Sequence, residues 1–188
     1  PLDKMMPDHP DFIVNVSASP FDYNHAAERL EVLKANVDRY RIPMFYSNIC
    51  GAQTELIFDG GSLVVDASGK VVDEMPYFRE DIRVYDLGEI VNDKGALDIV
   101  QAKDKYALIH DALVMGIRDY FDKLGFKKAI LGLSGGVDSA LTLVLAVRAL
   151  GKENVLSVLM PSQYSSEHSI SDSLQLLETL GSSHKIIP

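Results

Sequence analysis

The stretch AILGLSGGVDSALTLVLAV, residues 129–147, determines how the second half of the chain folds. Residues 129–133 are a short apolar run typical of a buried strand, and residues 139–150 are an apolar segment long enough for a helix. Gly151 follows that segment, as glycine commonly does at the end of a helix. The sequence Ser-Gly-Gly-Val-Asp-Ser at residues 134–139 therefore predicts a tight loop from a strand into a helix.

The same alternation of strands and helices continues along the second half. A helix that ends at Gly125 is predicted first, because apolar residues recur at helical spacing from Tyr106 to Leu124. Further strands are predicted at residues 155–160 and 185–187, with a helix at 169–180 between them. Strict alternation is typical of right-handed crossovers in a parallel sheet, so we expect an α/β domain over residues 104–188.

The first half has a different pattern. Residues 25–40 form an amphipathic helix, with an apolar stripe of Ala26, Leu30, Leu33 and Val37. Strands are predicted at residues 12–16, 44–49, 55–58, 62–66, 70–75 and 81–87. The segments Asp-Gly-Gly at residues 59–61 and Ala-Ser-Gly at 67–69 are typical hairpin turns. This half is an α+β arrangement over residues 1–88, and the polar residues 89–103 form a linker.

Bulk properties exclude several classes of protein. The 188 residues are 47% hydrophobic and 24% charged, as in an ordinary globular protein. The net charge of −9 disfavours a nucleic-acid partner, and no apolar run approaches the length of a membrane helix. The single cysteine, Cys50, fits a cytoplasmic location. The chain lacks an initiator methionine and soon enters a strand, so we expect a fragment of a longer protein.

The loop at residues 134–139 has the composition of a phosphate site. Gly135 and Gly136 allow backbone N–H groups to close on a ligand at the positive end of the next helix. Ser134 and Ser139 add hydroxyl donors, while Asp138 would repel a phosphate unless Mg²⁺ lay between them. The alternative is a plain turn in which Asp138 or Ser139 caps the helix. The sequence matches neither a Walker A loop nor a dinucleotide-binding fingerprint.

The Ser-Gly-Gly-Val-Asp-Ser sequence resembles the pyrophosphate loop of the N-type ATP pyrophosphatases, which split ATP into AMP and pyrophosphate while adenylating an acceptor. Residues 155–169 are similar to the second-strand segment of the glutamine-dependent NAD synthetases within that superfamily. Residues 15–21 and 53–62 resemble the later part of the nitrilase-like glutaminase domain that is fused to those synthetases. The resemblance implies part of a nitrilase-like α/β sandwich followed by a Rossmann-like parallel α/β domain.

The same resemblance implies a function. ATP with Mg²⁺ would adenylate the nicotinate carboxylate of deamido-NAD, and ammonia from glutamine would form the amide of NAD in a homo-oligomeric enzyme. Asp138 would be a Mg²⁺ ligand, and the backbone at Met160 would contact adenine. The implied ATP-binding residues are Gly132, Leu133, Ser134, Gly135, Gly136, Val137, Asp138, Ser139 and Met160.

Glutamine contacts are implied by the resemblance in the first half. Ser19 corresponds to a serine that contacts glutamine, and His25 stands where the family usually has lysine or arginine. The Glu, Lys and Cys triad of the glutaminase would lie before Pro1, so Cys50 is expected to be a packed residue. Much of the deamido-NAD site would follow Pro188.

Other interpretations stay open at this point. Another amidotransferase of the same superfamily would need a different glutaminase domain, and a module that only binds adenylate would generally lack the complete loop. His168 could contact a phosphate, but it precedes Ser169, which with Asp172 matches the pattern of a helix cap.

Overall fold

The computed structural model describes residues 1–91, 104–161 and 167–187. The chain divides into two compact units, Pro1–Ala112 and Leu113–Pro188, which are described separately below. Most of the predicted linker at residues 89–103 lies outside the described residues. No helix of the described part is long and apolar enough to cross a membrane.

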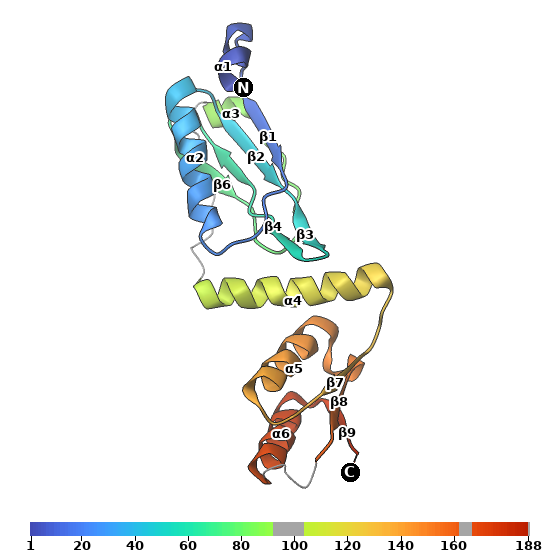
Figure 1. Ribbon diagram of the computed structural model, residues 1–188. Helices are drawn as coiled ribbons and strands as arrows, with labels where there is room; N and C mark the ends of the chain where they lie inside the picture. The colour runs from blue at the N-terminus through green and yellow to red at the C-terminus, as the bar shows by residue number, and fades with distance from the viewer. Residues whose placement is uncertain (92–103, 162–166, 188) are drawn as a thin grey trace. The chain divides into compact units, whose positions relative to one another are not determined.

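A four-stranded mixed sheet forms the centre of the first unit, with strands in the order β1-β2-β5-β6 (Figure 1). The sheet is mixed because β1 pairs with β2 in parallel, whereas β5 is antiparallel to both β2 and β6. The strands are β1 (Ile13–Ser17), β2 (Met44–Asn48), β5 (Leu63–Val65) and β6 (Val71–Glu74). The predicted hairpin at residues 67–69 is confirmed as the turn between β5 and β6.

Helix α2 (His25–Tyr40) covers one face of this sheet and matches the predicted helix at both ends. Its buried Leu33 and Val37 pack against alternate residues of the strands, including Ile13, Met44 and Tyr46. The strand predicted at residues 12–16 is confirmed as β1, but its apolar run is not buried throughout as such a run would suggest. Val14 and Val16 are exposed, because β1 is an edge strand of the described sheet and turns only alternate side chains toward α2.

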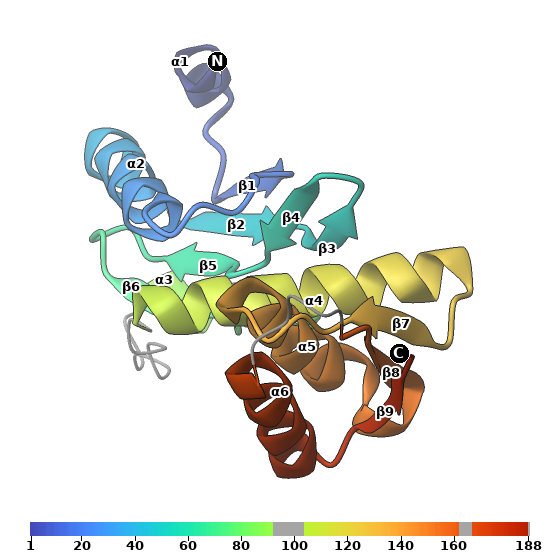
Figure 2. The ribbon, with the colours of Figure 1, turned by 60° about the horizontal axis from the view of Figure 1, so that its bottom comes forward.

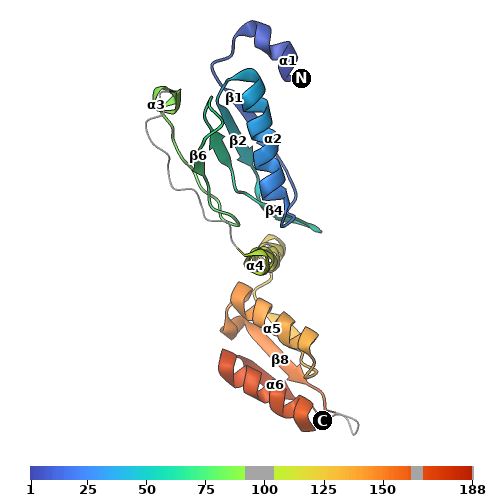
Figure 3. The same cartoon turned by 90° about the vertical axis from the view of Figure 1, so that its left-hand side faces the viewer.

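The opposite face of the sheet is partly covered by α3 (Leu87–Val91) and the segment that leads to it, shown in green in Figure 3. The strand predicted at residues 81–87 is wrong, since residues 81–86 have no strand structure. Arg83 and Tyr85 instead bind the buried carboxylate of Asp73, whereas Ile82 and Val84 are exposed. Arg83 and Tyr85 are therefore held in place by their side chains, and residues 81–86 form no ladder of backbone hydrogen bonds.

A second small sheet was not anticipated. β3 (Cys50–Gln53) and β4 (Leu56–Asp59) form an antiparallel hairpin whose turn contains Thr54 at φ 54°. The hairpin predicted at residues 59–61 is consequently wrong, because β4 pairs with β3 and β5 pairs with β2. Gly60 and Gly61, at φ 69° and 57°, carry the chain from one sheet to the other.

The second unit has the predicted parallel sheet, with strands in the order β7-β8-β9. Helices α5 and α6 pack on one side of it (Figure 2), and Leu143, Leu159 and Leu177 are buried between the layers. Helix α4 (Lys105–Leu124) precedes this sheet in the chain. The other elements are β7 (Ala129–Gly132), α5 (Val137–Leu150), the 3-10 turn η2 (Lys152–Asn154), β8 (Val155–Leu159), α6 (Glu167–Leu180) and β9 (Ser183–Ile186). The predicted α/β class is confirmed.

Two short helical segments lie at the start of the chain. Helix α1 (Leu2–Met5) is followed by the 3-10 turn η1 (Met6–Asp8). Leu2 and Met6 are partly buried against the core beneath α2, and Asp3 binds Arg39 and Tyr40 of that helix. These contacts attach the first residues to the first unit.

Candidate functional site

The loop at residues 134–139 lies at the C-terminal end of β7, where parallel α/β sheets commonly bind ligands. Leu133 is buried and its N–H donates to the carbonyl of Val158 on β8, 2.9 Å away, which fixes the start of the loop. Helix α5 begins at Val137, and Gly136 occupies its N-cap position without a side-chain cap. Asp138 and Ser139 therefore lie inside the first turn, and the alternative in which one of them caps the helix is wrong.

Two hydroxyl groups close the loop on itself. Ser134 Oγ and Ser139 Oγ lie 3.0 Å apart, and the Ser134 N–H donates to Ser139 Oγ at 3.2 Å. The Gly136 N–H points to Ser134 Oγ at 3.3 Å, and Ser139 Oγ donates to the Gly136 carbonyl at 3.0 Å. The two predicted hydroxyl donors are thus brought together at the N-terminal, positive end of α5.

Gly135 is required by both its backbone conformation and its surroundings. Its φ of 83° is a conformation that L side chains rarely adopt. A Cβ added there would lie 2.5 Å from the carbonyl oxygen of Ser169 on α6 and 2.7 Å from its Cα. The loop and the first turns of α6 therefore approach as closely as a glycine backbone permits.

Met160 lies beside the start of the same loop. It follows β8, its side chain is exposed, and its Cε lies 3.8 Å from where a Cβ on Gly132 would be. Gly132 and Val158 are partners in the register of β7 and β8. Asp138 and Val137 are both exposed on the first turn of α5. All nine predicted ATP-binding residues thus gather at one edge of the sheet.

The first turn of α6 differs from the prediction. The helix starts at Glu167, so Ser169 is a helical residue and does not cap it. The Ser169 carbonyl accepts a hydrogen bond from Ser173 Oγ at 2.7 Å, and the His168 carbonyl accepts one from Ser171 Oγ. His168 is exposed on this first turn.

Ser19 and His25, the predicted glutamine contacts, lie on the connection between β1 and α2. Ser19 is half-buried, and its N–H donates to Asn48 Oδ1 at 2.9 Å. His25 is the first residue of α2, and its Nδ1 lies 3.0 Å from the carbonyl of Pro20. The two predicted residues are therefore held on the same short segment.

A buried polar cluster lies behind that segment, and sequence reasoning missed it. Arg29 donates to both carboxylate oxygens of Asp59, at 3.0 and 3.1 Å, and to the Gly60 carbonyl. Its guanidinium also lies over the ring of Tyr46, 5.2 Å from the centroid. Asn48 Nδ2 donates to Asp59 Oδ1 at 2.9 Å. Two features of the sequence could have indicated the cluster. Arg29 lies on the same face of the helix as the buried Leu33, and Asp59 directly precedes two glycines.

Burial has an electrostatic consequence within this cluster. It raises the pKa of Asp59, and the charge of Arg29 and the hydrogen bonds from Arg29 and Asn48 oppose that rise. Glu74 also has a raised pKa because of burial, although Tyr77 donates a hydrogen bond to it at 2.6 Å. Two carboxyl groups of the first unit are thus desolvated and held by specific donors.

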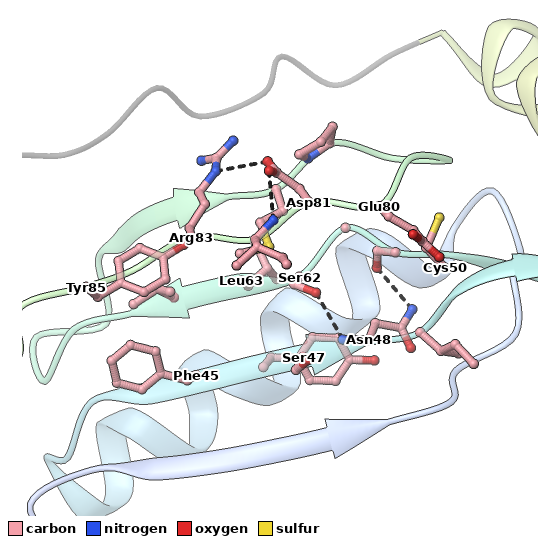
Figure 4. Close-up of a pocket in the computed structure, with 18 of the residues that line it drawn as sticks. Phe45, Ser47, Asn48, Cys50, Ser62, Leu63, Glu80, Asp81, Arg83 and Tyr85 are labelled. Carbon is pink, nitrogen blue, oxygen red and sulfur yellow. Dashed lines mark hydrogen bonds and ion pairs between the residues drawn. The ribbon is translucent and has the colours of Figure 1, made fainter.

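A pocket of about 750 Å³ opens on the face of the sheet opposite α2 (Figure 4). It is lined by apolar groups such as Phe45 and Leu63 and by the charged Asp81 and Arg83. Neither Ser19 nor His25 lines it. The pocket therefore does not coincide with the predicted glutamine contacts, although Asn48 lies at its border.

Cys50 is half-buried at the start of β3, close to Gly60. Its Cβ and Sγ lie 3.4 and 3.6 Å from where a Cβ on Gly60 would be, so it packs against the turn that ends β4. The structure places it as a small packing residue, as expected.

We expect Cys50→Ala, in the complete protein that carries this chain, to leave glutamine hydrolysis within a few-fold of normal. The loss of one partly buried sulfur should lower the free energy of unfolding by about 1 kcal/mol. Glutaminase assays and denaturant unfolding measure the two effects. Complete loss of hydrolysis in a stably folded variant would contradict the packing role.

Comparison with known proteins relates both units to one family. Residues 109–188 match the family model described as NAD synthase. A glutamine-dependent NAD(+) synthetase from Synechocystis sp. is 44% identical over 193 residues, which covers 100% of this chain and 34% of the relative. The chain is homologous to glutamine-dependent NAD(+) synthetases. The corresponding protein of Thermotoga maritima is 37% identical over 94% of this chain and 36% of its own length. The chain thus spans about a third of the length of the curated relatives it matches.

Solved structures agree with this relationship. The glutamine-dependent NAD+ synthetase of Acinetobacter baumannii, determined in complex with ADP, superposes with a TM-score of 0.91 at 33% identity. The match covers 98% of this chain and 35% of that protein. A synthetase of the same name from Cytophaga hutchinsonii, at 17% identity and a TM-score of 0.80, shares the fold. Both units therefore have counterparts within single chains of such synthetases.

Proposed function

We propose that the complete protein carrying this chain is a ligase that converts deamido-NAD to NAD, using ATP and ammonia released from glutamine. The observation that carries the proposal is the loop at residues 134–139. It places two hydroxyl groups and the N-terminus of α5 at the end of β7, in a chain 44% identical to a glutamine-dependent NAD(+) synthetase. Residues 1–88 would belong to the glutaminase part and residues 104–188 to the synthetase part.

The proposed chemistry explains why a pyrophosphate loop is needed. A carboxylate resists attack by ammonia, so one of its oxygens first attacks the α-phosphorus of ATP, which forms an acyl adenylate as pyrophosphate leaves. Ammonia then attacks the activated carbonyl carbon and AMP leaves, which forms the amide. In this scheme the hydroxyls of Ser134 and Ser139 and the backbone N–H groups that open α5 bind the departing pyrophosphate. They thereby stabilise the charge that develops on it.

Mg²⁺ fits the donor set of this loop as a nucleotide-bound ion. Within the described residues no group of three or more His, Cys, Asp or Glu side chains is placed to hold a metal. Mg²⁺ commonly binds through one or two carboxylates together with phosphates and water. The exposed carboxylate of Asp138, beside the proposed phosphate site, would be such a ligand. When bound, the ion would neutralise charge on the phosphates.

Adenine would lie along the edge of the same sheet, near Met160. Support comes from the register of β7 and β8, in which Gly132 pairs with Val158, and from Met160 Cε, which lies 3.8 Å from where a Cβ on Gly132 would be. The Acinetobacter baumannii relative was determined with ADP, another adenine nucleotide. Gly132 and Leu133 would contribute backbone groups to this part of the site.

Glutamine would be bound in the first unit through Ser19, with His25 on the same segment. Support comes from the placement of Ser19 between a buried cluster and the surface, where its position is fixed by hydrogen bonds. The homo-oligomeric state and the cytoplasmic location stay predictions.

The test is NAD formation by the complete protein from deamido-NAD and ATP, with glutamine or ammonium as the nitrogen donor. We expect Ser19→Ala to lower kcat/KM for glutamine by about tenfold, the equivalent of one hydrogen bond to the substrate. The ammonium-driven rate should stay near normal, because ammonium bypasses glutamine hydrolysis.

Ser17→Ala is the matched control, since Ser17 is the last residue of β1 and its Oγ donates to Asn15 Oδ1 on the same strand. It should leave both rates unchanged. An unmodified protein that forms no NAD with either donor would contradict the proposed function. Equal losses with both donors in Ser19→Ala would contradict a glutamine contact.

A further inference from the structure

Asn48 binds both backbone polar groups of Ser19. Its Oδ1 accepts the Ser19 N–H at 2.9 Å, and its Nδ2 lies 3.4 Å from the Ser19 carbonyl oxygen. Only an amide side chain presents an acceptor and a donor side by side in this way. The Asn48 side chain therefore pairs with the Ser19 peptide groups much as a neighbouring strand would, although the two residues are 29 positions apart.

The Asn48 side chain is itself fixed from behind. Nδ2 also donates to Asp59 Oδ1 at 2.9 Å and to the Gly60 carbonyl at 3.0 Å. Its backbone N–H donates to Ser62 Oγ, as the dashed line between them shows in Figure 4. With a relative exposure of 8%, Asn48 has little freedom to adopt another rotamer.

The partner of Asn48 is anchored in turn by an ion pair. Asp59, 1% exposed, receives two hydrogen bonds from Arg29, which is 8% exposed on α2. Both bonds come from Nη2, while Nη1 donates to the Gly60 carbonyl, so the guanidinium holds the carboxylate and the adjoining turn together. A continuous chain of buried contacts thus runs from α2 through Asp59 and Asn48 to the backbone of Ser19.

The segment that carries Ser19 has no regular structure of its own between β1 and α2. A second tie lies beyond Ser19, where the Phe21 N–H donates to the Ile57 carbonyl at 2.7 Å. The Asn48 contacts hold the backbone N–H and carbonyl of Ser19 itself. Without these hydrogen bonds, a serine in a loop would sample several positions. The rate of a reaction that needs the serine in one position would then be lower.

We propose that Asn48 is a positioning residue for glutamine hydrolysis, which acts by holding the backbone of Ser19 in its substrate-contacting position. This inference rests on the proposed function, in which Ser19 contacts glutamine. The Arg29–Asp59 pair serves as the rigid support of Asn48. Asn48 itself need not touch the substrate.

The experiment compares kcat and KM for glutamine and for ammonium in the complete protein. Asn48→Ala should lower kcat/KM for glutamine by about tenfold to a hundredfold, since a misplacement of about 1 Å in an active site can cost a hundredfold. Ammonium-driven NAD synthesis should stay near normal. Asn48→Asp, which is nearly isosteric and keeps the acceptor for the Ser19 N–H, replaces the donor to Asp59 Oδ1 by an oxygen 2.9 Å away, so it should show a selective loss at least as large.

Val37→Ala is the control for a general loss of stability. Val37 is fully buried on α2 in the core of the same unit, and it belongs to the apolar cluster, separate from the polar contacts of Ser19. It should destabilise the unit while leaving the glutamine KM unchanged. A glutamine-specific defect of equal size in Val37→Ala would overturn the proposal, because destabilisation alone would then explain the effect.

A double-mutant cycle tests whether Asn48 acts through Ser19. If it does, adding Asn48→Ala to Ser19→Ala should produce little further loss of glutamine kcat/KM. Additive losses would overturn the proposal, as would unchanged glutamine kinetics in Asn48→Ala with ammonium-driven synthesis intact. Failure of the proposed function has a different signature, namely that the unmodified protein makes no NAD from deamido-NAD with either nitrogen donor.

Discussion

Replacing Gly135 by alanine should destabilise the second unit by roughly 2–5 kcal/mol, from an unfavourable backbone conformation and from overpacking. The φ of 83° disfavours any L side chain, and the new Cβ would lie 2.5 Å from the Ser169 carbonyl oxygen. The obstructing atoms are the carbonyl oxygen, Cα and Cβ of Ser169, none of which a side-chain rotation can move away. Either the loop or the start of α6 must shift.

Gly136→Ala provides a matched control one residue along the same loop. Gly136 has an ordinary extended conformation, and a Cβ there would meet only Ser134 Oγ, at 3.5 Å. Its substitution should cost no more than about 1 kcal/mol, the usual range for a helix N-cap. Native-state hydrogen exchange of the amides in β7, α5 and β8 of the complete protein measures both effects, with those of β1 and β2 as an internal reference. Equal protection in the two variants would contradict the close approach of the loop and α6.

Elements with a continuous local pattern could be predicted from the sequence. The apolar stripe of α2 and the stop at Tyr40 gave correct bounds because the helix buries one face at a fixed spacing. The strands and helices of the second unit followed for the same reason, since short apolar strands alternate with helices that end at Gly125, Gly151 and Gly181. In these segments local preference and tertiary packing agree.

The errors occurred where pairing over distance decides the structure. β3 contains Gly51 and Ala52, which are weak strand formers, and it exists because β4 pairs with it. Residues 81–86 have the alternation of a strand, but the carboxylate of Asp73 holds Arg83 and Tyr85 in place of strand pairing. Local patterns do not encode which distant partner a segment finds.

The two candidate sites differ in the same way. The loop at residues 134–139, the proposed phosphate site, could be recognised from the sequence because its glycines and hydroxyl residues are consecutive. The support of Ser19 could not, since Asn48 and Asp59 come from strands far along the chain. Asp59 beside two glycines indicated a turn, and only the folded chain shows it to be the buried partner of Arg29.

Asp138→Asn should slow NAD synthesis about a hundred- to a thousandfold with both glutamine and ammonium, a loss typical of removing one electrostatic stabiliser from an active site. The substitution keeps the size of the side chain and removes the charge proposed to bind Mg²⁺. The fold should tolerate it, because the Asp138 side chain is exposed and its backbone carbonyl still accepts the hydrogen bond from Thr142 Oγ1. Rates with each nitrogen donor, measured over a range of Mg²⁺ concentrations, test the prediction.

Asp122→Asn is the control for the change in net charge, since Asp122 is an exposed acid on α4 outside the loop. It should leave both rates unchanged. The two donors separate the sites, because a defect at the ATP site stops amidation whatever the source of ammonia, whereas a defect at Ser19 affects glutamine alone. If Asp138→Asn kept its ammonium-driven rate at every Mg²⁺ concentration, residues 134–139 would not bind the phosphates of ATP. The proposed ATP site at the N-terminus of α5 would then be wrong.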